Sequence, residues 1–400
     1  MKRDVLSTTL KFALSSVAIF SSCAIFADMS SSQESETFSS EDSKSIVERN
    51  VHGSLGGKNP PYSSEGGFFL TGDFLYWQAE EDGLDLTSKV SIIDIKSTTT
   101  RTNTDSKKRL HFQWDPGFRI GAGFMFGGFD ALELFANWTR FHSSAHAHYS
   151  MPIPMIMSGE TQFIGKWLPG FLGDVYDARG NWRIHFDTID LSLGRNFFLS
   201  KRLSVKPYVG LRGALIDQKY KIVYKALNVD NDFLFPDTGM NAKNDFNGVG
   251  LRTGSEFQWH FSKQWNLFGS LSASIIRGRF DLKQNFNTAR LNDIMTEVIS
   301  GTFDYRNHFW TNRVNLEEQL GLQWETFFGR NKSRVSHLSI GAFYELGQWF
   351  QQNELSTIVF DPDPTIGGIP FGAFGEITEE NEKHDDLNFQ GLTIRACLKF

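Results

Sequence analysis

The C-terminal stretch Leu392-Thr393-Ile394-Arg395-Ala396-Cys397-Leu398-Lys399-Phe400 alternates apolar and polar residues and stops on an aromatic side chain. Successive side chains on a β-strand point to opposite faces. The stretch therefore predicts a strand with one apolar face (Leu392, Ile394, Ala396, Leu398, Phe400) and one more polar face. A strand of a soluble sandwich has the same pattern, and the two classes differ in which face meets lipid.

The same alternation recurs through the chain. It predicts ten strands: Gly67–Glu80, Leu110–Phe126, Phe129–His142, Trp182–Phe198, Leu203–Tyr220, Phe246–Phe261, Trp265–Phe280, Asn307–Phe327, Arg334–Phe350 and Leu387–Phe400. Short polar turns alternate with five long connections: Glu81–Arg109, Ser143–Asn181, Lys221–Asp245, Asp281–Arg306 and Gln351–Asp386. Outer-membrane barrels have short periplasmic turns and long extracellular loops. We therefore expect an all-β transmembrane antiparallel barrel of about ten strands, or twelve if Ser143–Asn181 hides a hairpin.

Two details of the pattern bear on the barrel. Seven aromatic residues lie beside the short turns or at the C-terminus, where the periplasmic aromatic girdle of such a barrel belongs: Phe126, Phe129, Phe198, Phe261, Trp265, Phe327 and Phe400. Glu318 falls on the apolar face of its strand, where a charge facing lipid is costly. We expect either a shift of register there or a contact of Glu318 with a partner subunit.

The N-terminus predicts export. Lys2 and Arg3 precede an apolar run that ends near Ala27, so residues 1–27 read as a cleaved signal peptide. Cys23 leaves a lipidation site as the alternative. Residues 28–66 are rich in Ser, Glu, Lys and Gly, and we expect a disordered periplasmic extension before a barrel over residues 67–400. After cleavage only Cys397 remains, which excludes an intramolecular disulfide.

Composition narrows the class further. The chain has 400 residues with a formal net charge of −6, 14% aromatic residues and 36 glycines. Its mean hydropathy of −0.30 is too low for a bundle of membrane helices, whereas half of each barrel strand faces a polar lumen. The mild acidity argues against nucleic acid as a partner, because nucleic acid requires a basic surface.

Candidate metal and catalytic residues are sparse. His142, His146 and His148 share one face of their strand and could suggest a zinc or copper site, but they do not supply a full coordination shell. Asp361 and Asp363 could suggest a calcium site, but they offer only two carboxylates between prolines. We therefore predict no metal and no other cofactor. A rim hydrolase is the enzymatic alternative, with Asp187 and His185, or His142 and Asp177, as the imaginable pairs. No G-x-S-x-G or H-E-x-x-H motif supports it, so we predict that the protein is not an enzyme.

Three stretches carry a family resemblance: Asp73–Trp77 followed by Glu81–Leu84, then Trp114–Gly121, then Asn137–His142. In order and spacing they resemble the major outer membrane protein family of Legionella- and chlamydia-type intracellular bacteria. The resemblance covers residues 67–142 best and implies a pore-forming outer-membrane protein. The chain departs from the cysteine-rich chlamydial members, which puts disulfide cross-linking into an envelope network in doubt.

These observations lead to one main functional expectation and one alternative. The main one is a porin-like outer-membrane channel for passive diffusion of small polar solutes or ions; the alternative is a structural or adhesive barrel with a closed lumen. The polar parity predicts twelve lumen-lining charges: Asp73, Arg119, Glu133, Asp190, Lys206, Arg212, Arg252, Glu256, Arg313, Glu317, Glu345 and Arg395. Their signs balance, so we expect cross-lumen ion pairs and a narrow, nearly non-selective pore.

Partners follow from the same expectation. Ile394, Leu398 and Phe400 form the expected signal for the barrel-assembly machinery, and outer-membrane lipid surrounds the wall. A homo-oligomer is compatible with the sequence, which does not fix the oligomeric state.

Overall fold

The structure is a computed structural model that describes residues 66–95, 98–102, 107–126, 132–153, 161–167, 174–228, 233–234, 236–291, 298–331, 334–360, 377–382 and 384–400. The predicted signal peptide, Cys23, Asp361 and Asp363 lie outside these residues, as does the expected N-terminal extension up to residue 65. The chain divides into two compact units, Met1–Tyr62 with Phe197–Ser204, and Ser63–Asn196 with Val205–Phe400. No helix among the described residues is long and apolar enough to cross a membrane.

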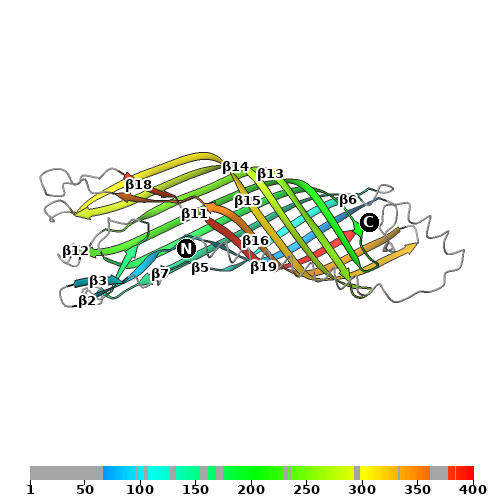
Figure 1. Cartoon of the computed structure of the whole chain (residues 1–400), viewed down its shortest axis with the longest axis horizontal. Helices are drawn as coiled ribbons and strands as arrows, with labels where there is room; N and C mark the ends of the chain where they lie inside the picture. Colours follow the sequence, from blue (N-terminus) through cyan, green and yellow to red (C-terminus); the bar gives the residue numbers. More distant parts are fainter. Residues whose placement is uncertain are drawn as a thin grey trace. The chain divides into compact units, whose positions relative to one another are not determined.

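The long strands form a closed antiparallel barrel, as the sequence predicts. Its ten strands are β1 (Gly67–Glu81), β6 (Trp114–Met125), β7 (Leu132–Ser150), β9 (Asp174–Arg195), β11 (Leu203–Asn228), β13 (Thr238–His260), β14 (Trp265–Leu291), β15 (Val298–Asn331), β16 (Arg334–Asn353) and β19 (Asp385–Lys399). Each strand pairs with the next, and β1 pairs with both β6 and β19, which closes the ring. Figure 1 shows these strands running side by side.

Nine short strands among the described residues accompany the ten long ones, and three of the nine pair with barrel strands in the same sheet. They are β2 (Thr87–Ile95), β3 (Thr98–Thr102), β4 (Lys107–Lys108), β5 (His111–Phe112), β8 (Thr161–Gly165), β10 (Phe197–Phe198), β12 (Phe233–Leu234), β17 (Ser356–Phe360) and β18 (Ile377–Glu382). β2, β3, β4 and β8 form a small separate sheet, and β17 pairs with β18. In Figure 1 β2, β3, β12 and β18 lie at the end of the strands opposite the C-terminus.

The barrel strands are longer than the sequence pattern predicts, and the long connections are correspondingly shorter. β14 and β15 stay paired from Trp265↔Trp324 to Leu291↔Val298, so most of the predicted connection Asp281–Arg306 is a β-ladder. The hairpin considered within Ser143–Asn181 does not enter the barrel, because β8 pairs with β2 instead. The ring therefore has ten strands rather than twelve.

The physical reason for the error is an inversion of the two faces along each strand. On β11, Val209, Leu211 and Leu215 point outward and are about half exposed, while Arg212 between them is buried inside. Beyond Leu215 the inward residues are apolar from Ile216 onward except for Gln218, and the outward ones are charged except for Val223. The same inversion lies between Asn247 and Val249 on β13 and between Ile275 and Arg277 on β14.

We call the part before the inversion, next to the short turns, the polar-lumen section. The part beyond it is the apolar-core section. The buried cluster of the latter includes Trp167, Trp182, Tyr220, Tyr224, Phe246, Phe280 and Phe286. An interior of this kind holds together a barrel that stands in water, whereas an apolar outer wall suits lipid.

The outer wall of the polar-lumen section is an apolar band. Its exposed residues include Phe74, Ile120, Ile189, Leu251, Leu320, Ile340 and Leu392. Of the predicted girdle, Phe126, Phe261, Trp265, Phe327 and Phe400 are exposed. Phe198 is only partly exposed, and Phe129 lies outside the described residues. Glu318 lies on this outward face between Leu271 and Leu346, and the pairing of β15 with β14 and β16 runs through it without a break. The expected shift of register at Glu318 was therefore wrong.

Candidate functional site

The interior of the polar-lumen section is crossed by ion pairs, which begin with a cluster around Asp73. Arg119 on β6 donates to Asp73 Oδ2 from Nη1 at 3.1 Å and to Glu345 Oε2 from Nη2 at 3.0 Å. Arg395 on β19 reaches Asp73 Oδ2 at 2.9 Å. Gln319 also donates to Glu345. Because β6 and β16 are separated in the ring by β1 and β19, the Arg119–Glu345 contact spans the inside of the barrel.

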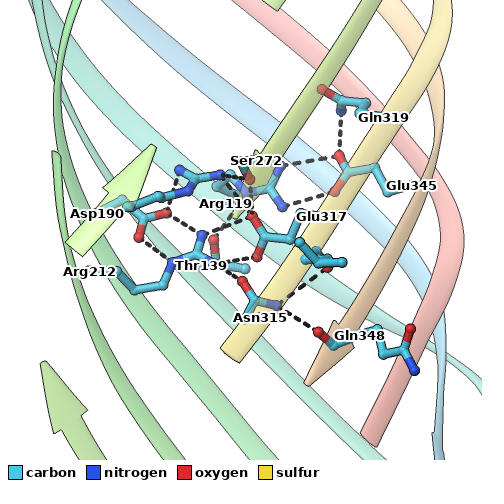
Figure 2. Close-up of polar contacts among 12 residues, drawn as sticks. Arg119, Thr139, Asp190, Arg212, Ser272, Asn315, Glu317, Gln319, Glu345 and Gln348 are labelled. Carbon is cyan, nitrogen blue, oxygen red and sulfur yellow. Dashed lines mark hydrogen bonds and ion pairs between the residues drawn. The ribbon is translucent and has the colours of Figure 1, made fainter. Parts of the chain in front are cut away.

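A second cluster joins β9, β11, β13 and β15. Arg212 Nε lies 2.6 Å from Asp190 Oδ1, and its Nη2 lies 2.9 Å from Glu317 Oε2. Arg252 bridges the same two carboxylates, at 2.9 Å from Asp190 Oδ2 and 2.7 Å from Glu317 Oε2. Figure 2 shows Arg212, Asp190 and Glu317 converging, and Asn315 Oδ1 accepts from Arg212 Nη1 at 2.5 Å. Each of the two guanidinium groups thus contacts both carboxylates, and the four groups together carry no net charge.

Two smaller sets complete the charged interior. Lys206 Nζ lies 2.8 Å from both Glu133 Oε1 and Glu256 Oε2. Arg313 pairs with Glu354 and lies over the ring of Phe280, 4.8 Å from its centroid. The structure therefore places all twelve charges of the predicted set inside the barrel, each in an ion pair.

The arrangement is balanced in sign. The Asp73 cluster and the Arg212 cluster each hold two cations and two anions, and the side chains of Asp73 and Arg212 are only 1% and 2% exposed. Such pairs do not stabilise a barrel more than apolar side chains of the same volume would, because each charge loses its hydration. Neither cluster forms the single-sign ring that selects cations or anions.

An aromatic layer lies beyond the charged clusters, toward the apolar-core section. Phe389 on β19 packs against Phe186 on β9, with ring centroids 4.6 Å apart, and against Trp77 at 6.1 Å. Phe141 and Trp349 extend the layer to β7 and β16. β9 and β19 are separated in the ring by β7, β6 and β1, so the layer crosses the interior. We call these five residues the aromatic layer.

Sequence reasoning missed several interior residues. It missed the aromatic layer because apolar residues were expected only outside. Glu325, which lies 3.3 Å from His337 Nε2 and 3.8 Å from His260 Nε2, shares parity with Glu317 and could have been found by extending that strand. Glu354 could not, because it lies in a segment expected to be a loop.

An acidic group lies at the end of β1 that is farthest from the short turns. Asp82 accepts from Asn388 Nδ2 at 3.3 Å, and its backbone N donates to Asp386 O at 3.0 Å. Burial, followed by the nearby charges of Glu80, Asp385 and Asp386, raises the pKa of Asp82 to about 6. Burial likewise raises the pKa of Glu81, which is 2% exposed, well above its usual range.

The histidines and the imagined catalytic pairs lie on the outer wall. His142 stacks on His185 with ring centroids 4.3 Å apart, and His148 rather than His142 contacts Asp177, at 2.6 Å. Asp187 accepts from Trp138 Nε1 at 3.0 Å, not from His185. Neither of the two pairs considered for the hydrolase alternative is therefore formed. Within the described part of the chain no group of three or more His, Cys, Asp or Glu residues is arranged to hold a metal ion.

The predicted assembly residues lie where the ring closes. β19 pairs with β1 over Phe69↔Lys399 to Glu81↔Leu387, and Phe400 N donates to Phe68 O at 2.9 Å. Ile394 and Phe400 are 45% and 62% exposed, and Leu398 on the same face is partly exposed.

Comparison with known families fits this architecture. A family model described as the Legionella pneumophila major outer membrane protein precursor matches residues 61–400. The chain belongs to this family. The resemblance noted in the sequence is therefore confirmed, and with it the location in the outer membrane. No curated protein matches the chain.

Solved structures of outer-membrane proteins show only distant similarity. The outer membrane protease OmpT of Escherichia coli has 10% identity and a TM-score of 0.36, covering 84% of this chain and 96% of its own. The CymD monoaromatic hydrocarbon channel has 10% identity and a TM-score of 0.29, covering 86% and 91%. The toluene transporter TodX of Pseudomonas putida has 9% identity and a TM-score of 0.27, covering 84% and 90%.

Proposed function

We propose that this member of the Legionella major outer membrane protein family is a narrow channel for small polar solutes and ions, closed in its resting state. The observation that carries the proposal is the charged interior of the polar-lumen section. A barrel that served only as a wall would gain as much stability from an apolar filling, since buried ion pairs are a poor source of stability. Charges along the lumen instead offer a permeating ion or polar solute a path with hydrogen-bonding partners.

The aromatic layer supports the closed resting state. Trp349 and Phe389 are 1% and 5% exposed, and with Phe141, Phe186 and Trp77 they span the interior on the route from the charged clusters to the outside. A constriction of apolar side chains blocks ions because it excludes water. Opening then requires these rings to move apart, and brief, small conductance steps are the expected signature.

Planar-bilayer recording of the folded full-length protein tests this proposal. Wild type should give rare openings, and Phe389→Ala should open more often, because Phe389 contacts three other rings of the layer. Phe286→Ala is the matched control: it removes an equally buried ring, 1% exposed, from the apolar-core section. Equal opening of both variants would contradict gating by the aromatic layer.

A structural barrel with a permanently closed lumen is the second candidate, and the packing of the aromatic rings against one another across the interior is the observation that favours it. It predicts no conductance from wild type or from Phe389→Ala, provided that both are folded. Selectivity provides a further distinction. In a conducting channel, Arg212→Gln with Arg252→Gln should leave Asp190 and Glu317 without their cations and shift the reversal potential toward cation preference.

A further inference from the structure

One side of the outer wall carries rows of cations beyond the apolar band, and a belt of acidic and other polar residues separates the two. Arg183 on β9 faces Lys219 on β11, and on the next pairs Lys243 on β13 faces Lys283 on β14, which faces Arg306 on β15. β11 pairs with β13, so the cations cover five neighbouring strands. All five side chains are exposed. We call these residues the cationic wall.

Placing like charges directly opposite one another across a sheet is unfavourable. Within the described part of the chain, none of the five side chains forms an ion pair or a hydrogen bond. The acids Asp217, Asp245 and Asp281 lie on the same strands, one outward position nearer the apolar band, and Asp245 itself faces Asp281. The five bases therefore face other bases and Asp245 faces Asp281, whereas Asp217 faces His185.

The cations are not a consequence of composition, because the chain as a whole is acidic. They are also confined to one side. On β1 and β19 the corresponding outward positions hold neutral or acidic groups, among them Gln78, Glu80 and Asp386. A local excess of basic residues on a mildly acidic protein indicates an anionic partner at that place.

The position of the wall identifies the kind of partner. Below the cations and the polar residues next to them, on β11, β14 and β15, the outward residues Leu215, Ile275 and Trp310 are 49%, 63% and 61% exposed. The long-connection end of an outer-membrane barrel faces the outside of the cell. The cationic wall therefore lies at the headgroups of the outer leaflet, with apolar surface below it for acyl chains. From β9 to β15 it is about 19 Å wide at the usual strand spacing, enough for a large headgroup.

We propose that the cationic wall binds the phosphorylated headgroup of an outer-leaflet glycolipid. The phosphates lie between the rows formed by Lys219, Lys243, Lys283 and Arg306, and the acyl chains lie against the apolar band below. A free phosphate compound would make no use of that apolar surface. The proposal does not depend on the channel function, because the wall and the lumen are on opposite faces of the same strands.

The test uses the full-length folded protein in detergent, with native mass spectrometry to count bound lipid. The probes are a bisphosphorylated lipid A, the same lipid after removal of its phosphates, and inorganic pyrophosphate. The variant carries Lys243→Gln, Lys283→Gln and Arg306→Gln. The matched control carries Lys201→Gln, Arg202→Gln and Lys263→Gln, the same residue types and charge change beside the short turns.

Wild type and the control should prefer the phosphorylated lipid, and the wall variant should bind it at least tenfold more weakly, since each basic residue beside an anionic surface contributes roughly fivefold in affinity. Equal affinity of the wall variant and the control would overturn the proposal. So would wild-type binding that ignores the lipid phosphates, and so would pyrophosphate binding as tight as that of the lipid, which would indicate a site for free anions.

A single substitution covers the case in which the triple variant folds poorly. Lys283→Glu places an acid between Lys243 and Arg306 and should raise the melting temperature of the lipid-free barrel, because it removes two like-charge contacts. The same substitution should reduce the stabilisation that bisphosphorylated lipid A gives to wild type. An undiminished stabilisation by the lipid would count against the cationic wall as its site.

Discussion

Asp73 is a buried acid whose ion-pair partners come from the two strands that flank its own. Its carboxylate lies between the guanidinium groups of Arg119 and Arg395, and its side chain is 1% exposed. Parity along β1 predicts that Asp73 points inward, but not which cations it meets. Those partners come from β6 and β19, and their heights depend on the stagger of strands around the ring, which no local pattern encodes.

Removing this carboxylate should be costly. Asp73→Ala leaves two guanidinium groups without their shared anion, and we expect a loss of about 3–5 kcal/mol in the free energy of unfolding, as for other broken buried pairs. The measurement is urea unfolding in lipid vesicles. Asp217→Ala, on the exposed outer face, is the control and should change the stability by no more than about 0.5 kcal/mol. A loss no larger than that of the control would contradict the assignment of Asp73 as a buried anchor.

Asp82 should make stability depend on pH. Its folded-state pKa of about 6 lies above its ordinary value of 3.8, so the ionised form is disfavoured by folding. Stability should therefore rise as the pH falls from 8 to 5, and be lost again as Asp82 ionises. Asp82→Asn keeps an acceptor for Asn388 and should reduce this dependence while raising the melting temperature at pH 8. Melting of the folded band on unboiled gels at both pH values provides the measurement. A variant with the full wild-type pH dependence would contradict this origin.

At the scale of the elements, the sequence predicts the existence and order of all ten barrel strands but not their lengths. The pattern-based strands stop near Tyr220 and Phe280, whereas β11 and β14 continue to Asn228 and Leu291. Beyond the inversion, Asp217 and Lys219 point to water and Ile216 points inward. If apolar residues are expected only on the outer face of a strand, the part of β11 beyond the inversion is predicted to be a loop. Testing each strand for both assignments of its faces would have recovered most of the missing length.

Closure of the ring depends on the last strand. We expect Phe400→Ser to reduce the amount of folded barrel in outer-membrane fractions, because Phe400, with Leu398 and Ile394, ends the strand that pairs with both β1 and β16. The assay compares heated and unheated samples by gel mobility. Phe327→Ser is the control, since Phe327 is also exposed at the short-turn end. Normal assembly of Phe400→Ser would remove the C-terminus as the assembly signal.

At the scale of the whole molecule, the inversion of faces marks where lipid ends. Composition predicts a barrel in a membrane, but it cannot predict that the same strands also build a second, water-facing part with its own apolar core. That division depends on the position of the inversion in every strand, and only the assembled ring shows that the positions agree.

Two substitutions on one strand test this boundary. Leu211 and Val223 both point outward on β11, on either side of the inversion. Leu211→Arg should cost about 2–4 kcal/mol, as for a charge facing the middle of the bilayer. Val223→Arg should cost little, because its neighbours Lys221 and Lys225 already face water. The measurement is the free energy of unfolding of both variants in lipid vesicles. Equal losses of stability in the two variants would contradict a lipid boundary between Leu211 and Val223.

The inversion also gives each strand an absolute position along the barrel. A strand with uniform alternation keeps its faces correct when it slides by two residues, and only a one-residue slip is punished. Here a two-residue slide on β11 could carry Asp217 into the lipid or Arg212 into the hydrocarbon-like core. A shift of β11 in either direction along the barrel axis therefore costs free energy. The inversion thus fixes how deep each strand sits in the membrane during insertion.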